Sequence, residues 1–221
     1  MQKIFRLFST MLLISILFSA TACDNAELDK ESTSEIDKLN ELSQNYIEMG
    51  DFDEAIEYAR KATELDPKNS VAWNNLGSAF LSKGDSAKAI EYLNKSTELN
   101  PKFEVAWNNI GLAYNNKGDY DEAIKFYQKA IELNPQYGMA FNNIGLAYEN
   151  KGDRDEAINF YRKAVDISPK EADIWNNLGN AYFAKGEYLK ALDFYNKALE
   201  LKPTNEVYRK NRDSAQSMLE N

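Results

Sequence analysis

The 221-residue sequence has no histidine and only one cysteine, Cys23. Histidine is the commonest general base and metal ligand among side chains, and a lone cysteine cannot form an internal disulfide. The sequence also lacks a glycine-rich phosphate-binding loop. Neighbouring carboxylates such as Asp121 and Glu122 fall where a helix is expected to begin, and there acidic residues favour the helix dipole. We therefore expect no catalytic residues, no metal and no cofactor, and we do not expect an enzyme.

Basic residues are the minority among the charges. The chain has 26 lysines and arginines against 35 aspartates and glutamates, which gives a net charge of −9. No basic stretch occurs beyond the extreme N-terminus. Proteins that bind nucleic acid need a basic surface that displaces counterions from phosphates. Nucleic acid is therefore excluded as an expected partner.

Long hydrophobic runs are also scarce, and the one that exists lies near the N-terminus. Residues 7–19 are almost all apolar and follow Lys3 and Arg6. The run is short for a membrane-spanning helix and ends in small residues. This is the arrangement of a secretory signal peptide.

The only cysteine directly follows this run. The residues before and at that point, Ala20-Thr21-Ala22-Cys23, resemble the lipobox of bacterial lipoproteins. The resemblance implies that residues 1–22 are a signal peptide that is removed and that Cys23 carries two or three acyl chains, palmitate among them. Two chains make membrane anchoring stable. The alternative is an ordinary cleaved signal that leaves a free cysteine.

After Cys23 the chain becomes polar and acidic up to residue 35. We expect residues 23–35 to be the lipidated cysteine and a disordered acidic tether, because the segment has no apolar periodicity. Asp24 resembles the inner-membrane retention signal of enteric bacteria, a rule that does not hold in all phyla. The expected location is the bacterial cell envelope, and the choice between inner and outer membrane stays open.

The rest of the chain is organised around a repeat of 34 residues. Its clearest mark is an aromatic residue followed by two asparagines, an aliphatic residue and a glycine, as in Trp73 to Gly77. The pattern returns with Trp107, Phe141 and Trp175 at its first position. All five prolines follow the same step, at Pro67, Pro101, Pro135, Pro169 and Pro203. A fixed period of this length predicts a solenoid of stacked supersecondary units.

Each unit reads as two helices. In the third unit, apolar residues recur at helical spacing over residues 104–116 and again over residues 120–133. Gly118 between them supplies a left-handed residue that ends the first helix, and Asp119 is expected to cap the second. Pro135 then stops the second helix. The sequence therefore predicts helix, turn and helix in each unit.

Tryptophan, leucine or isoleucine, glycine and tyrosine on the first helix, followed by alanine, tyrosine, alanine and proline on the second, resemble the tetratricopeptide repeat (TPR). The resemblance implies an all-α fold: a right-handed TPR solenoid of five helix-turn-helix repeats plus a C-terminal capping helix. The expected units are residues 36–69, 70–103, 104–137, 138–171 and 172–205, and the capping helix is expected in residues 206–221.

In this family the first helices line a concave groove in which partners bind. Pairs of asparagines recur on these helices, and an amide can pair with a peptide backbone through its donor and its acceptor. They resemble the asparagine ladder of O-linked N-acetylglucosamine transferase, whose superhelix holds extended peptides. The alternative is that asparagine is common at these repeat positions and has no ligand. The expected peptide-binding residues are Asn74, Asn75, Asn108, Asn109, Asn142, Asn143, Asn176, Asn177, Val71, Val105, Met139, Leu112 and Leu146.

The groove lacks the lysines and arginine with which some TPR domains clamp the acidic C-terminus of a chaperone, so no chaperone carboxylate clamp is expected. The resemblance implies a membrane-anchored adaptor or scaffold that binds a peptide segment or helix of another cell-envelope protein. The alternative is a self-associating structural lipoprotein whose groove has no ligand. The sequence does not identify the partner.

Overall fold

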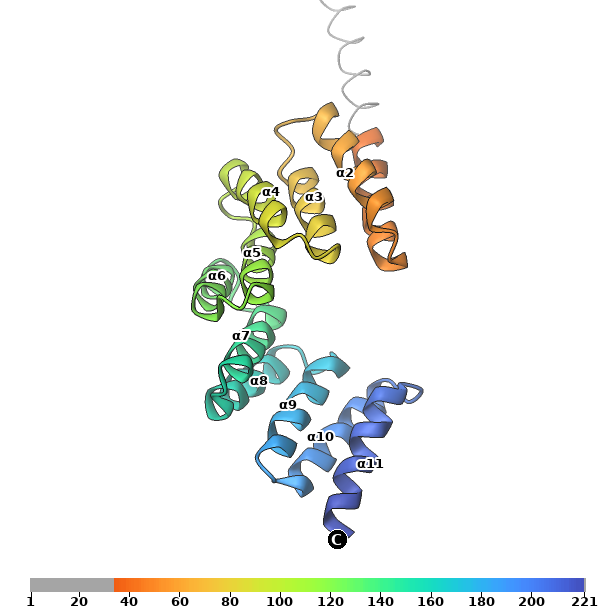
Figure 1. The fold of residues 1–221 in the computed structure, drawn as a ribbon, viewed down its shortest axis with the longest axis vertical. Helices are drawn as coiled ribbons and strands as arrows, with labels where there is room; N and C mark the ends of the chain where they lie inside the picture. Colours follow the sequence, from red (N-terminus) through yellow and green to blue (C-terminus); the bar gives the residue numbers. More distant parts are fainter. Residues whose placement is uncertain (1–33, 221) are drawn as a thin grey trace, which may run out of the picture.

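The computed structural model describes residues 34–220, and this part of the chain is a row of antiparallel helices without any strand (Figure 1). Helical residues 34–49 are followed by ten further helices. These are α2 (Phe52–Leu65), α3 (Ser70–Ser82), α4 (Ser86–Leu99), α5 (Glu104–Asn116), α6 (Tyr120–Leu133), α7 (Gly138–Lys151), α8 (Arg154–Ile167), α9 (Ala172–Ala184), α10 (Tyr188–Leu201) and α11 (Glu206–Glu220).

The two helices of each unit are joined by a tight turn that contains a glycine. Gly118, between α5 and α6, has a φ of 84°, which only glycine adopts at little cost. The boundaries expected for these two helices, residues 104–116 and 120–133, are confirmed. The expected capping by Asp119 is wrong: its side chain makes no cap hydrogen bond. Its carboxylate instead lies 3.1 Å from the ammonium of Lys117.

Within a unit the helices cross closely because the first helix has a glycine at the crossing. A methyl group placed on Gly145 of α7 would lie 2.6 Å from the ring of Tyr161 on α8. Tyr161 is fully buried, and alanines at positions 157 and 164 of the same helix are buried beside it. The close approach removes a tyrosine ring from water in each of the third to fifth units, which supplies much of the core.

Successive units then stack along the array. The second helix of one unit packs against the first helix of the next, and α11 closes the row by packing on α10. Tyr208 and Ala215 of α11 are buried there, while most of its other side chains are exposed. In Figure 1 the helix pairs follow one another from α2 to α11 along a curved path. The all-α solenoid of five repeats with a capping helix is confirmed.

None of the helices in residues 34–220 is long and apolar enough to cross a membrane. The predicted signal peptide, Cys23 and the start of the acidic tether lie outside the described residues, so their roles stay predictions.

Candidate peptide-binding groove

Contacts between helices identify the inner side of the curve. Each first helix touches the first helix of the next unit, through the pairs α3–α5, α5–α7, α7–α9 and α9–α11. Among the described helices, no two successive second helices make such contacts. The first helices therefore line the inner, concave side, where the resemblance to TPR proteins predicts the groove.

The apolar residues expected in the groove lie on these inner helices and are not fully covered. Val71 of α3 is 44% exposed and Met139 of α7 is 43% exposed. Val105, Leu112 and Leu146 on α5 and α7 are partly buried. Exposed apolar side chains on a concave surface favour contact with another molecule.

The paired asparagines have a different environment from the one expected for a peptide-binding surface. The second asparagine of each pair donates a hydrogen bond to the first asparagine of the preceding unit. The Nδ2–Oδ1 distances are 3.0 Å for Asn109–Asn74, 2.9 Å for Asn143–Asn108 and 3.0 Å for Asn177–Asn142. The amides thus form a ladder that runs along the inner helices and links unit to unit.

The ladder has a definite beginning and end. Asn40, in the helix of residues 34–49, accepts from Asn75 at 3.3 Å, and Asn211 of α11 donates to Asn176 at 2.9 Å. Glu41 stands where the other units have the second asparagine, and Lys210 stands where they have the first asparagine, so no further rung forms at either end of the described helices. Two rungs have an additional partner: Asn109 also donates to Ser78, and Asn211 also donates to Asn180.

Burial of the ladder limits what these amides can offer a ligand. Asn74, Asn75, Asn108, Asn142, Asn143 and Asn176 are between 3% and 7% exposed, and Asn109 and Asn177 are partly buried. The ladder therefore holds the units together, since a buried amide without a partner would cost about 1–3 kcal/mol. Their binding of a peptide stays a prediction, and in this arrangement little of their surface faces the groove.

Sequence reasoning missed Asn40, Asn211, Ser78 and Asn180 as members of this network. The available signal was an offset, because each rung joins residues 35 positions apart in a repeat of 34. An offset of 35 indicates that the second asparagine of one pair lies opposite the first asparagine of the preceding pair.

Two acidic residues of the inner helices, Glu149 and Asp173, accept hydrogen bonds from tyrosine hydroxyl groups. Glu149 accepts a hydrogen bond of 2.8 Å from the hydroxyl of Tyr161. Asp173 of α9 accepts from the hydroxyl of Tyr208 and lies 3.1 Å from the ammonium of Lys202. These hydrogen bonds, that of Tyr208 first, lower the pKa of Asp173, while burial and the same carboxylate raise the pKa of Tyr208.

The contacts of Asp173 predict that attachment of α11 depends on pH. Because the pKa of Asp173 is lower in the folded chain, its stabilising contribution is present at pH values above its ordinary pKa of 3.8 and is lost as the pH falls through the folded value. We expect the protection factors of the α11 amides, which are corrected for the intrinsic exchange rate at each pH, to fall more between pH 7 and pH 3 in the wild type than in Asp173→Asn. An equal fall of the protection factors in the two proteins would contradict this prediction.

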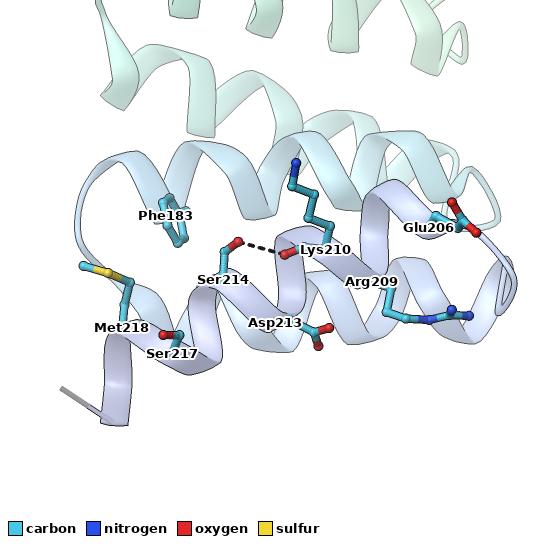
Figure 2. A pocket seen from close by; sticks show the side chains of 8 residues that line it. All are labelled: Phe183, Glu206, Arg209, Lys210, Asp213, Ser214, Ser217 and Met218. Carbon is cyan, nitrogen blue, oxygen red and sulfur yellow. Dashed lines mark hydrogen bonds between the residues drawn. The ribbon is translucent and has the colours of Figure 1, made fainter.

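The inner side ends in a cavity of about 670 Å³ between α9 and α11 (Figure 2). Phe183 and Met218 lie at one end of it, and Arg209 and Glu206 lie at the other. Lys210, beside Arg209 in the lining, extends from α11 toward α9. The cavity is amphipathic, with apolar side chains beside charged groups.

Two buried polar atoms in the third unit have no hydrogen-bond partner. They are the hydroxyl of Tyr127 and the side-chain oxygen of Asn115. The corresponding residues of the fourth unit, Tyr161 and Glu149, are bonded to each other. Asparagine is one methylene shorter than glutamate, which explains why the bond is absent in the third unit. Burial alone raises the pKa of Tyr127.

No group of histidine, cysteine, aspartate and glutamate within residues 34–220 is arranged to hold a metal ion. The described helices form a curved array of pairs, whose inner helices carry partly exposed apolar side chains and a network of bonded amides. This defines the class of the molecule as a helical-repeat protein.

Comparisons with known proteins place it more closely. Models of the tetratricopeptide repeat match residues 40–102, 105–137, 126–159 and 172–205, and a TPR-repeat model matches residues 150–186. The chain belongs to the tetratricopeptide repeat family. A search of curated protein sequences gave no match.

Solved structures of other TPR proteins resemble this one. MamA is 32% identical, with a TM-score of 0.59 over 73% of this chain and 95% of that chain. TTC0263 from Thermus thermophilus is 23% identical, with a TM-score of 0.74 over 82% of this chain and 98% of that one. PilF from Pseudomonas aeruginosa is 20% identical, with a TM-score of 0.69 over 85% and 90%. For TTC0263 and PilF, sequence identity is low and the similarity shows a shared fold only. Proteins of this fold generally mediate protein–protein interaction.

Proposed function

We propose that this protein is a membrane-anchored adaptor of the bacterial cell envelope. Its concave groove would bind a peptide segment or helix of another envelope protein, and Cys23 would carry the lipid anchor. The observation that carries the proposal is the set of partly exposed apolar side chains on the inner helices, Val71, Val105, Leu112, Met139 and Leu146.

The groove chemistry favours a partner with an apolar centre. Between α3 and α7 the exposed inner positions named above are aliphatic or methionine, and the amides beneath them are already bonded to one another. A bound segment would gain most of its free energy by covering these side chains, at roughly 25 cal/mol per Å² of apolar surface. Direct hydrogen bonds to the ladder would contribute less, because its donors are in use.

Crosslinking capture from membranes tests this proposal. We expect Val105→Asp combined with Met139→Asp to reduce capture of a partner at least about tenfold, because a charge would be placed in an apolar contact. Leu189→Asp is the matched control: Leu189 is 68% exposed and lies on α10, a second helix outside the groove. Capture that survives the groove substitutions would refute groove binding.

A second candidate function is self-association. It is favoured by exposed apolar residues at the C-terminal end of the array, where Leu189 is 68%, Met218 is 47% and Leu219 is 39% exposed. Sedimentation over a range of concentrations separates the two functions. A self-associating protein would lose its larger species in Leu189→Asp, whereas an adaptor would be monomeric in both forms.

The anchor has its own test. Cys23→Ser should move the protein from the membrane fraction to the soluble fraction if the cysteine is lipidated. Retention in the membrane fraction would contradict lipidation as the means of attachment, without bearing on the groove.

A further inference from the structure

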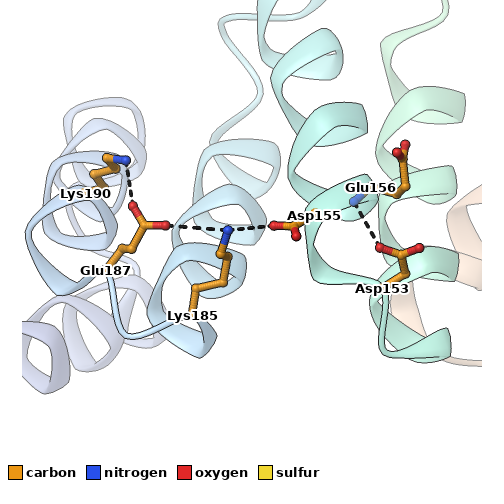
Figure 3. Close-up of polar contacts among 6 residues, drawn as sticks. All are labelled: Asp153, Asp155, Glu156, Lys185, Glu187 and Lys190. Carbon is orange, nitrogen blue, oxygen red and sulfur yellow. Dashed lines mark hydrogen bonds and ion pairs between the residues drawn. The ribbon is translucent and has the colours of Figure 1, made fainter.

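Two kinds of bond link successive units, and a third lies within the fourth and fifth units; each is missing in the third unit or at one of its junctions. The first joins the turn of one unit to the second helix of the unit before it. Lys185 in the α9–α10 turn lies 2.6 Å from Asp155 of α8, and Lys185 also contacts Glu187, which in turn pairs with Lys190 (Figure 3). Lys83 with Asp53 and Lys151 with Asp121 repeat the link between units.

The junction of the second and third units lacks this ion pair. The position that corresponds to Asp155 holds Ala87, which has no carboxylate. Lys117, the matching lysine, pairs with Asp119 of its own turn instead. At the junction of the fifth unit with the capping helix, the two positions hold Leu189 and Leu219. Among the junctions between complete units, only the junction of the second and third units lacks the ion pair.

The second recurring bond lies at the opposite end of the helices. The indole nitrogen of the repeat tryptophan donates to the carbonyl of the proline six residues earlier, in the loop between units. The distance is 2.9 Å for Trp73, Trp107 and Trp175. Arg209 makes the equivalent contact to Pro203 in the capping helix. The junction of the third and fourth units has Phe141 at this position, and a phenyl ring has no donor.

The third bond holds the buried tyrosine of a unit. Tyr161 and Tyr195 donate to Glu149 and Asn180 of their own units, at 2.8 Å and 2.9 Å. Tyr127 of the third unit is the one tyrosine of this set whose hydroxyl has no partner.

These omissions are independent in sequence, and all of them lie in the third unit or at one of its two junctions. From them we infer that the third unit, α5 with α6, is a flexible joint about which the two halves of the groove move. One junction lacks its link at the turn end of the helices, and the other lacks it at the loop end. The amide rungs Asn109–Asn74 and Asn143–Asn108 remain, so the inner helices stay connected at both junctions of this unit.

The joint lies under the middle of the groove. Val105 and Leu112 are on α5 itself, and Met139 and Leu146 are on the adjoining α7. Movement at the third unit would therefore change the separation of these side chains and let the groove accept segments of different width. The inference concerns the motion of the unliganded chain and does not require that the proposed partner exists.

The experiment restores the missing bonds. Ala87→Asp, Phe141→Trp and Asn115→Glu each copy a residue from a unit in which the bond is made. Spin labels attached at Glu57→Cys on α2 and Asp193→Cys on α10, in a Cys23→Ser background, report the distance across the joint. We expect the triple variant to give a narrower distance distribution than the unmodified array. Amide exchange in α5 and α6 should slow by roughly fivefold for each restored hydrogen bond and by less for the exposed ion pair.

A second variant, in which the same bonds are removed elsewhere, controls for effects of the substitutions that are unrelated to the bonds. Asp155→Ala with Trp175→Phe removes the same two links from the junction of the fourth and fifth units. This variant should broaden the distribution and accelerate exchange in α8 and α9. A linear array without a joint unfolds from its ends, so its protection would be highest in the middle. Highest protection in α5 and α6, or an unchanged distribution in the triple variant, would overturn the inference.

Discussion

Replacing Asn108 with alanine is expected to lower the free energy of unfolding by about 2 kcal/mol, within the 1–3 kcal/mol cost of an unpaired buried polar group. Asn108 is 4% exposed and accepts the 2.9 Å hydrogen bond from Asn143, which is itself 6% exposed. The alanine would leave the amide of Asn143 buried without its acceptor. Urea denaturation followed by circular dichroism measures the loss.

Asn116→Ala is the matched control, because Asn116 is on the same helix and is exposed. It should change stability by less than about 0.5 kcal/mol, as surface substitutions usually do. The double variant Asn108→Ala with Asn143→Ala should cost less than the sum of the single changes, since no orphaned amide remains. Additive losses would show that the two amides act separately and that the rung has no energetic role.

The second large effect concerns the glycine at a helix crossing. Gly145→Ala would place a methyl group 2.6 Å from Cδ1 and 2.7 Å from Cε1 of Tyr161, whose ring is fully buried. The hydrogen bond from Tyr161 to Glu149 restrains the ring from moving away. Overpacking costs about 1–3 kcal/mol and occasionally more, while alanine gains about 1 kcal/mol of helix propensity over glycine. Because the ring is restrained, we expect an overpacking cost at the upper end of this range and hence a net loss of about 2 kcal/mol.

Thermal unfolding of Gly145→Ala beside Asn150→Ala tests this prediction. Asn150 lies on the same helix and is exposed, so its substitution reports the effect of an added alanine without a clash. A variant at Gly145 that is as stable as the wild type would mean that α7 and α8 can separate without cost.

The sequence predicted the helices more completely than the site. Gly118 and Pro135 end helices through their own backbone properties, which neighbouring units do not alter. The partner of an asparagine is different, because an amide pairs equally well with a peptide, with water or with another amide. Only the stacking of one first helix on the next brings Asn143 within 2.9 Å of Asn108. The sequence therefore predicts that the amides form a row along the first helices. It does not predict that they bond to one another between units.

The aspartates at the turns also differ from one unit to the next in a way that depends on their neighbours. Asp119 has the spacing of a capping residue, but Lys117 lies within reach of its carboxylate and competes for it. Asp153, at the corresponding position of the next unit, does accept a hydrogen bond from the backbone of Glu156, at 3.3 Å. Two identical residues at one repeat position thus have different partners, which the pattern alone does not reveal.

The direction of the amide ladder has a consequence for the length of such a protein. Every rung donates from a later unit to an earlier one, so each internal unit presents the same acceptor at one edge and the same donor at the other. A complete copy of such a unit inserted between residues 137 and 138 would meet a complementary edge on both sides. The design is modular: the reach of the molecule can grow or shrink by whole repeats while its two terminal helices are kept unchanged.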